Sequence, residues 1–190
     1  MKRRHFLFGG LAILAASLMG GKVLAAEQPL PLDNAKILVA YYSYSGNTKK
    51  VAKAINEQVG GDIFEIKAND NYPAEYKDMV MQAKQEIQSN YRPNLTTSLT
   101  DVDKYDVIFL GSPNWWGTIT PQVSSFLEKY NLSGKTVIPF ITHGSGGFQN
   151  TVSDMTKQCK GCNIYPDAWD SYGDNVDGLP DWLAKIGFKK

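Results

Sequence analysis

Cysteine and histidine are scarce in this chain, which contains two of each among 190 residues. The cysteines, Cys159 and Cys162, stand together, and neither histidine, His5 or His143, lies near them in the sequence. A structural zinc site is built from four nitrogen or sulfur ligands. The composition therefore excludes a zinc site at this cysteine pair.

A strong net charge, internal repeats and low-complexity linkers are also missing. The chain carries 20 Lys and Arg against 19 Asp and Glu, a formal net charge of +1. Proteins that bind nucleic acid rely on many basic contacts to phosphate, so this balance argues against such a partner. It also argues against a dedicated small electron carrier, because a carrier of that kind has a strongly acidic face.

The N-terminal apolar stretch is too short to cross a membrane. Phe6 to Met19 is uncharged over 14 residues, whereas a bilayer-spanning helix needs roughly 20. Three basic residues, Lys2 to Arg4, precede the stretch, and the small residues of Val23 to Ala25 follow it. This arrangement is typical of a signal peptide. Removal of residues 1–25 takes away four basic residues and no acidic one, which leaves a net charge of −3.

The segment Arg3 to Leu7 resembles the twin-arginine export motif. That pathway carries proteins that are already folded, often around a cofactor. The alternative is a general secretory signal whose basic region happens to contain two arginines. Both alternatives predict an exported, for example periplasmic, protein that is not inserted in the membrane after cleavage.

The mature chain alternates between short apolar runs and amphipathic segments. After a loose lead-in at residues 26–35, the pattern predicts one domain over residues 36–190. Alternation of strands and helices predicts a parallel sheet with helices on both faces. The expected strands are Ile37–Ala40, Ile63–Lys67, Tyr105–Leu110, Thr136–Thr142 and Asn163–Ala168, and the expected helices are Lys49–Val59, Pro73–Ser89, Thr120–Tyr130, Asn150–Gln158 and Gly178–Ile186.

The first strand is followed by a turn rich in hydroxyl groups, Ser43 to Thr48, with the sequence S-Y-S-G-N-T. Backbone N–H groups and short hydroxyls at the N-terminus of a helix suit a phosphate dianion. The turn contains no acid or base, so we expect it to bind a ligand rather than to react with it. It lacks the G-K-[ST] ending of a Walker loop and the spaced glycines of a dinucleotide fingerprint. The alternative is an ordinary turn with Ser or Asn as the helix N-cap.

Two further loops follow the third and fourth expected strands, and ligands of such sheets bind at these strand ends. Gly111 to Thr118 has two adjacent tryptophans, Trp115 and Trp116, one of which we expect to pack inward. The other can stack on a flat conjugated ligand. His143 to Phe148 is rich in glycine, which allows close backbone approach. His143 either places a proton donor near a ligand or is simply hydrogen-bonded at the strand end.

Together these three loops resemble those of the flavodoxin-like FMN-binding family, from about Lys36 to the end of the chain. The resemblance implies a doubly wound, five-stranded parallel sheet of order 2-1-3-4-5. In that family the first loop binds the FMN phosphate, the second forms the aromatic wall of the isoalloxazine, and the third borders its polar edge. The implied cofactor-binding residues are Ser43, Tyr44, Ser45, Gly46, Asn47, Thr48, Pro113, Asn114, Trp115, Trp116, Gly117, Thr118, His143, Gly144, Ser145 and Gly146.

The two cysteines form a C-x-x-C pair in a chain that is expected to be exported, so a disulfide is permitted. Cys159 ends a predicted helix and Cys162 precedes a predicted strand. The negative end of a helix dipole disfavours a thiolate, whereas reactive pairs sit at the positive end. We favour a structural disulfide over free thiols and over a redox-active pair.

The function implied by the resemblance is electron transfer through bound FMN in the cell envelope, to a redox protein or a quinone-type acceptor. The chemistry belongs to the flavin, and the protein holds it and tunes its potential. His143 is the obvious candidate for a cation that tunes it. An enzymatic alternative is an FMN-dependent NAD(P)H:quinone or azo reductase, although nicotinamide coenzymes are scarce outside the cytoplasm. A third alternative is a binding module without flavin.

Overall fold

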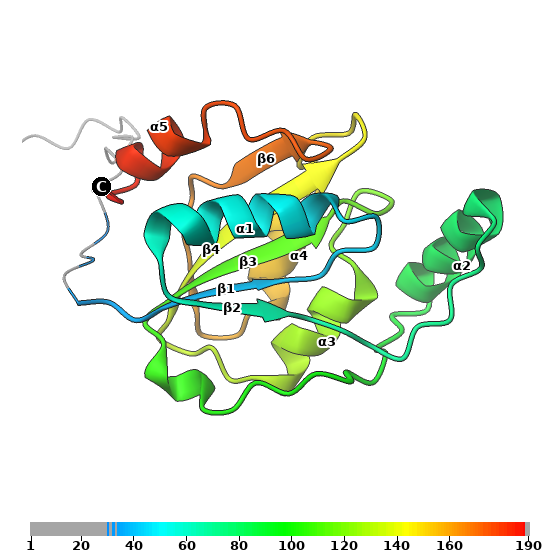
Figure 1. Ribbon diagram of the computed structural model, residues 1–190. Helices are drawn as coiled ribbons and strands as arrows, with labels where there is room; N and C mark the ends of the chain where they lie inside the picture. Colours follow the sequence, from blue (N-terminus) through cyan, green and yellow to red (C-terminus); the bar gives the residue numbers. More distant parts are fainter. Residues whose placement is uncertain (1–29, 31, 33, 189–190) are drawn as a thin grey trace, which may run out of the picture.

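The computed structural model in Figure 1 describes residues 30, 32 and 34–188. Strands and helices alternate along this part of the chain, with one short 3-10 helix, η1. The strands are β1 (Ile37–Tyr41), β2 (Asp62–Glu65), β3 (Val107–Pro113), β4 (Thr136–His143), β5 (Asn163–Ile164) and β6 (Trp169–Tyr172). The helices are α1 (Asn47–Val59), α2 (Tyr76–Gln88), η1 (Val102–Lys104), α3 (Pro121–Lys129), α4 (Thr151–Gln158) and α5 (Leu179–Lys185).

The strands form one parallel sheet in the order β2-β1-β3-β4-β5. The predicted strand order is therefore confirmed. β1 and β3 are buried almost throughout and read as continuous apolar runs, which is characteristic of strands covered on both faces. Because all these strands run in the same direction, the loops that follow them meet at one edge of the sheet.

The prediction of a fifth strand at Asn163–Ala168 was wrong in its extent. β5 has two residues, and β6 begins after Pro166 and pairs with the second half of β4. Both segments lie on the edge of β4 that β3 leaves free. Proline has no N–H group to donate to the neighbouring strand, so the chain leaves β4 at this point and returns with β6.

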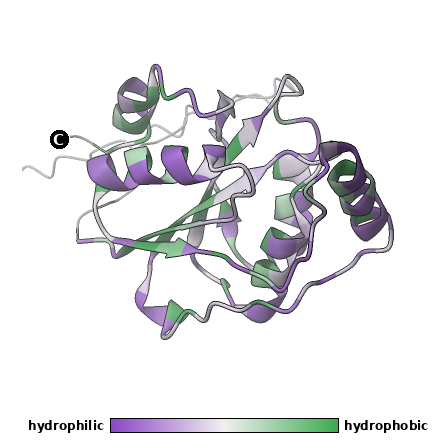
Figure 2. Cartoon of the chain, turned by 45° about the vertical axis from the view of Figure 1, so that its right-hand side comes forward, coloured by the Kyte–Doolittle hydropathy of each residue, from purple (hydrophilic) through white to green (hydrophobic). Residues whose placement is uncertain are grey.

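Two hydrophobic cores cover the two faces of the sheet. One joins the sheet to α1 and α5 through residues such as Ile55 and Leu183, and the other joins it to α3 and α4 through residues such as Phe126 and Met155. Figure 2 shows the hydrophobic colour along the strands, while the outer sides of the helices are mostly hydrophilic. Helices on both faces are therefore confirmed, with α2 as an exception.

Helix α2 stands away from the sheet, on the side toward which the strand arrowheads point in Figure 1. Its buried residues, Met79 and Ala83, belong to neither of the two cores. The apolar stripe predicted for this segment is present, but it does not pack on a face of the sheet. It faces the edge at which the strands end.

Strand β3 is longer than predicted and includes Gly111 to Pro113, which the sequence placed in the second loop. Gly111 pairs with Phe140 on β4. A Cβ atom at Gly111 would lie 2.2 Å from the Phe140 ring, so glycine is required by this close approach. The loop itself begins at Asn114 and carries the two tryptophans.

The beginning of the described chain is more closely packed than a loose lead-in. Leu30 and Leu32 pack against the core under α5, and the Leu30 N–H donates to the carbonyl of Ile186. The predicted signal peptide, residues 1–25, lies outside the described residues. Among the described helices, none has both the length and the apolar character that crossing a membrane requires.

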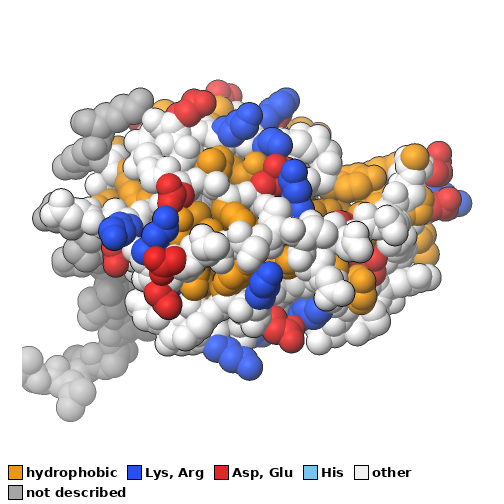
Figure 3. All heavy atoms as spheres, turned by 60° about the horizontal axis from the view of Figure 1, so that its bottom comes forward, with side chains coloured by type: hydrophobic (Ala, Val, Ile, Leu, Met, Phe, Trp, Pro, Cys, Tyr) orange, Lys and Arg blue, Asp and Glu red, His pale blue; other side chains and the backbone are white. Residues whose placement is uncertain are grey.

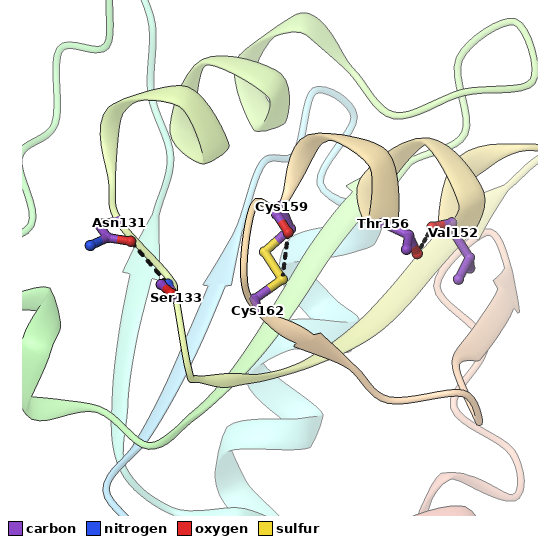
Figure 4. Close-up of a disulfide and its surroundings, with 6 residues drawn as sticks. All are labelled: Asn131, Ser133, Val152, Thr156, Cys159 and Cys162. Atoms are coloured by element: carbon purple, nitrogen blue, oxygen red, sulfur yellow. Dashed lines mark hydrogen bonds between the residues drawn. A yellow bond between two sulfur atoms is a disulfide. The ribbon is translucent and has the colours of Figure 1, made fainter.

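Cys159 and Cys162 are joined by a disulfide in the structure (Figure 4). Cys159 caps the end of α4, and Cys162 directly precedes β5. The disulfide therefore lies at the edge of the sheet where the strands begin, opposite the three loops.

Candidate functional site

The three predicted loops surround one cavity of about 660 Å³ at the carboxyl ends of the strands. Most of the predicted site residues line it: Tyr44, Ser45, Asn47, Pro113, Asn114, Trp115, Trp116, Gly117, His143, Gly144 and Gly146. Five predicted residues do not line it: Ser43, Gly46, Thr48, Thr118 and Ser145. This volume is typical of small-molecule sites.

The first loop leaves the N-terminus of α1 without a side-chain cap. The N-cap residue is Gly46, with φ of +93°, a left-handed conformation that glycine adopts without strain. Three residues earlier in the same loop, Ser43 Oγ is buried with no hydrogen-bond partner within the described part of the chain. A buried hydroxyl without a partner is costly. The loop therefore offers open N–H groups and an unsatisfied hydroxyl to an anion.

The basic residues next to this loop are engaged elsewhere. Lys49 Nζ lies 3.0 Å from Glu65, and Lys50 Nζ donates to Asp174. The Lys50 hydrogen bond holds the pKa of Asp174 below its usual value. An anion at the first loop would therefore be bound mainly by backbone and hydroxyl groups.

Thr48 and Thr118 have structural partners that explain why they face away from the cavity. The Thr48 and Thr142 hydroxyls lie 2.8 Å apart in the interior and join α1 to β4. Thr118 Oγ1 donates to Asp154 on α4 at 2.7 Å. Both side chains thus stabilise the packing of the elements that surround the cavity.

Trp115 is the inward-facing tryptophan of the pair. It is half-buried and packs against the core under α3. Three tyrosine rings contact its indole edge to face, with centroid separations of 5.9 Å for Tyr42, 5.9 Å for Tyr44 and 5.4 Å for Tyr72. Such contacts fix the plane of the indole.

A polar network lies behind this aromatic cluster. Asp70 accepts hydrogen bonds from Tyr42 Oη at 3.0 Å and from Gln122 Nε2 at 2.7 Å. Gln122 also donates to Tyr72 Oη, which in turn donates to Glu86 on α2. Burial raises the pKa of Tyr42 and of Tyr72, so both phenols stay protonated donors. The network therefore fixes the positions of Tyr42 and Tyr72, which contact the indole of Trp115.

Trp116 turns outward and contacts α2. Its backbone has φ of +53°, an uncommon value for a bulky residue, and its side chain is 51% exposed. The indole N–H donates to the carbonyl of Val80 at 3.0 Å, and Lys84 Nζ lies 4.5 Å from the ring centroid. Trp116 thus anchors α2 to the second loop.

The second and third loops are joined through Asn114. Its Nδ2 donates to the Gly147 carbonyl at 2.7 Å, and its Oδ1 accepts the Gly117 N–H at 2.9 Å. Both loops therefore form one rigid rim of the cavity.

His143 is held by a carboxylate that the sequence analysis missed. Nε2 lies 3.0 Å from Asp170 Oδ2 on β6, and Nδ1 is buried without a partner among the described residues. The side chain is 10% exposed. Nδ1 is therefore left to bond to whatever occupies the neighbouring space.

Other lining residues were also missed, and most of them belong to α2. They are Tyr76, Met79, Val80, Ala83, Thr142 and Gln149. The sequence predicts an amphipathic helix here, but the prediction of helices on both faces of the sheet gives no reason to place this one at the cavity. The position of Asp170 follows only from the register of β6 on β4.

Comparison with known proteins identifies the family. A family model described as Flavodoxin matches residues 36–186. The chain belongs to the flavodoxin family. The match covers the sheet, all three loops and α2. The cavity lies at these loops, where the resemblance to this family implies that FMN binds.

Solved structures agree with this membership. A protein of Bacteroides eggerthii is 29% identical, with a TM-score of 0.73 over 82% of this chain and 100% of its own. A flavoprotein of Lactobacillus acidophilus, solved in complex with FMN, is 26% identical, with a TM-score of 0.66 over 78% of this chain and 98% of its own.

Two curated relatives of this flavodoxin-family chain carry the name NAD(P)H dehydrogenase (quinone). The one from Archaeoglobus fulgidus is 28% identical over 64% of this chain, and the one from Azorhizobium caulinodans is 31% identical over 62%. The matches span 63% and 62% of the length of these relatives.

Proposed function

We propose that this protein is an FMN-dependent oxidoreductase that passes electrons to a quinone-type acceptor. The observation that carries the proposal is the uncapped N-terminus of α1, in a loop whose Tyr44, Ser45 and Asn47 line the same cavity as Trp115. These groups fit the phosphate and the flat ring of FMN, respectively.

The residues that would hold FMN follow from their positions. Ser43, Ser45 and the first-turn N–H groups of α1 would bind the phosphate, and no basic side chain would be required. Trp115, fixed by its three tyrosine neighbours, stacks on the ring and excludes water from it. His143, held by Asp170, presents Nδ1 as a hydrogen-bonding atom to the ring's polar edge. When bound, FMN supplies the capacity to accept and pass on electrons.

The names of the curated relatives support a quinone as the acceptor. A quinone is a small, flat and largely apolar molecule, and the cavity combines aromatic and apolar lining with a few polar groups. The electron donor is a reductase or a reduced nicotinamide. Steady-state oxidation of NADH with a quinone, in the absence of any second protein, distinguishes the two donors.

The location that we propose is outside the cytoplasm, reached through a twin-arginine-type signal in residues 1–25. Replacement of Arg3 and Arg4 by lysine tests this proposal. The pair of substitutions is expected to retain the protein in the cytoplasm, and unchanged export would contradict the twin-arginine route.

The absorption and fluorescence of the purified protein with added FMN test the cofactor. Binding is expected to shift the visible flavin bands and to quench flavin fluorescence through stacking on Trp115. A protein that leaves the spectrum and the fluorescence of FMN unchanged would refute the proposed function.

A further inference from the structure

Helix α2 presents one apolar face to the cavity. Tyr76, Met79, Val80 and Ala83 all line it, and their spacing of three and four residues places them on one side of a helix. Met79 is 4% exposed and Ala83 is 2% exposed. Neither residue belongs to the cores of the sheet, so both are covered on the side of α2 that lines the cavity and not by packing on the sheet.

The position of α2 is fixed by residues of the site itself. Trp116 donates to the carbonyl of Val80, Lys84 lies over the Trp116 ring, and Tyr72 donates to Glu86. The helix is thus attached to the same loop that carries Trp115. The outward face of α2 is exposed to solvent: Met81 is 47% exposed, and Gln85 is also exposed.

The walls of the cavity differ in chemistry. The loops after β1, β3 and β4 contribute hydroxyls, amides, backbone groups and His143, whereas α2 contributes methionine, valine and alanine side chains together with Tyr76. The loops supply the hydrogen-bonding groups that a polar cofactor requires. Apart from the hydroxyl of Tyr76, the α2 wall offers apolar contact, and methionine adapts readily to flat ligands of different shape.

We propose that α2 forms the acceptor-binding wall of the cavity and that Met79, Val80 and Ala83 determine which quinones the protein accepts. This inference rests on the proposed function. Ala83 has the smallest of the three side chains, so a larger residue at this position takes up space at the wall that the acceptor would contact. FMN binding depends on the loops and not on these three residues.

The test measures equilibrium binding of menadione, a small naphthoquinone, to the oxidised, FMN-loaded full-length protein by difference absorbance. FMN affinity is measured in parallel by fluorescence quenching. Ala83→Phe fills the space beside the wall, and Gln85→Phe adds the same ring on the outward face of the helix as a matched control. We expect Ala83→Phe to weaken menadione binding at least about tenfold, while Gln85→Phe leaves it unchanged and both variants keep wild-type FMN affinity.

A second pair of variants keeps the proposal testable if Ala83→Phe does not fold. Met79→Ala enlarges the cavity, and Met81→Ala removes the same side chain from the exposed face. Met79→Ala is expected to shift the preference from menadione toward a bulkier naphthoquinone, and Met81→Ala is not. Menadione affinity and preference that are the same in all four variants as in the wild type would overturn the proposal.

The failure of this inference differs from the failure of the proposed function. A wild-type protein that binds FMN but neither binds menadione nor is reoxidised by it refutes quinone as the acceptor, and the proposal about α2 falls with it. A wild-type protein that binds menadione, with variants that lose FMN and menadione to the same degree, refutes only the assignment of α2, because the helix then supports the cofactor.

Discussion

The two edges of the sheet differ in how completely their polar groups are paired. At the carboxyl edge, Ser43 Oγ and His143 Nδ1 are buried without partners among the described residues. At the amino edge, Lys135 Nζ is buried and donates to the carbonyls of Asp103 and Tyr105, at 3.1 and 2.7 Å. Buried polar groups without a partner in the protein mark a place where a ligand can bind, so the comparison assigns binding to one edge and stability to the other.

The amino edge also carries ion pairs and a covalent link. Lys104 and Tyr105 donate to Asp62 at 2.9 and 2.6 Å, and the disulfide ties α4 to β5. On the face in Figure 3, acidic and basic side chains lie close to one another, without an extended area of either sign. Changes at this edge are therefore expected to affect stability and to leave ligand binding intact.

The largest effect is expected from Lys135→Met at the amino edge. The buried carbonyl of Tyr105 and the partly buried carbonyl of Asp103 lose their donor, and the loss of a donor to a buried group costs about 1–3 kcal/mol. We expect the free energy of unfolding in urea to fall by about 2–4 kcal/mol, with FMN affinity unchanged in the folded protein. Lys160→Met, at an exposed lysine, is the control and should change stability by less than about 0.5 kcal/mol. A loss of FMN affinity in Lys135→Met would contradict the assignment of stability to the amino edge and of ligand binding to the carboxyl edge.

Ser43→Ala, at the carboxyl edge, is expected to weaken FMN binding without lowering the stability of the FMN-free protein. A hydrogen bond to a charged group contributes about 1.5–3 kcal/mol, so FMN should bind about 10- to 150-fold more weakly, as titrated by fluorescence. The FMN-free protein should unfold at the same urea concentration or a higher one, because a buried hydroxyl without a partner is removed. Ser98→Ala, at an exposed serine outside the three loops, is the matched control. Equal effects of the two substitutions would show that Ser43 has no special role.

A smaller effect is expected on the reduction potential of the bound flavin. Because Nε2–H of His143 bonds to the Asp170 carboxylate, Nδ1 can donate to the ring only when the imidazole is positively charged. His143→Ala removes this cation, which stabilises reduced flavin. The potential measured by dye equilibration should therefore fall. Asp170→Asn should lower it less, since the ring of His143 remains in place. An unchanged potential in His143→Ala would place the imidazole outside the site.

The smallest effect concerns the exposed carboxylate of Asp62 and its pH dependence. Hydrogen bonds from Lys104 and Tyr105 hold the pKa of Asp62 below its usual 3.8. A carboxylate whose pKa is lowered on folding stabilises the protein above the unfolded-state value and loses this contribution as the pH falls through the folded-state value. Wild type should therefore be slightly more stable than Asp62→Asn at neutral pH, and the difference should disappear progressively below pH 3.8. Urea unfolding across this range measures it.

Much of the fold could be predicted because it depends on local patterns. Buried parallel strands are short apolar runs, and the hydroxyl-rich turn after β1 marks the N-terminus of α1. The position of α2 could not be predicted in this way. An apolar stripe such as that of Met79 and Ala83 shows that a helix is covered on one side, but it does not show what covers it.

The candidate site was predicted in outline for the same reason. Loops after parallel strands must meet, so the convergence of three of them followed from topology. The outward turn of Trp116 and the pairing of His143 with Asp170 did not, because the first depends on a left-handed backbone and the second on where β6 rejoins β4 after Pro166.

Helix α2 contributes to neither core, and this has a consequence for how the protein can change. Substitutions in α2 that keep its contacts through Val80, Lys84 and Glu86 do not alter the packing of either core. The rest of the segment Tyr76–Gln88 can therefore be varied separately from the sheet. Grafting the corresponding helix from another member of the family onto this frame offers a route to new substrate preferences without rebuilding the domain.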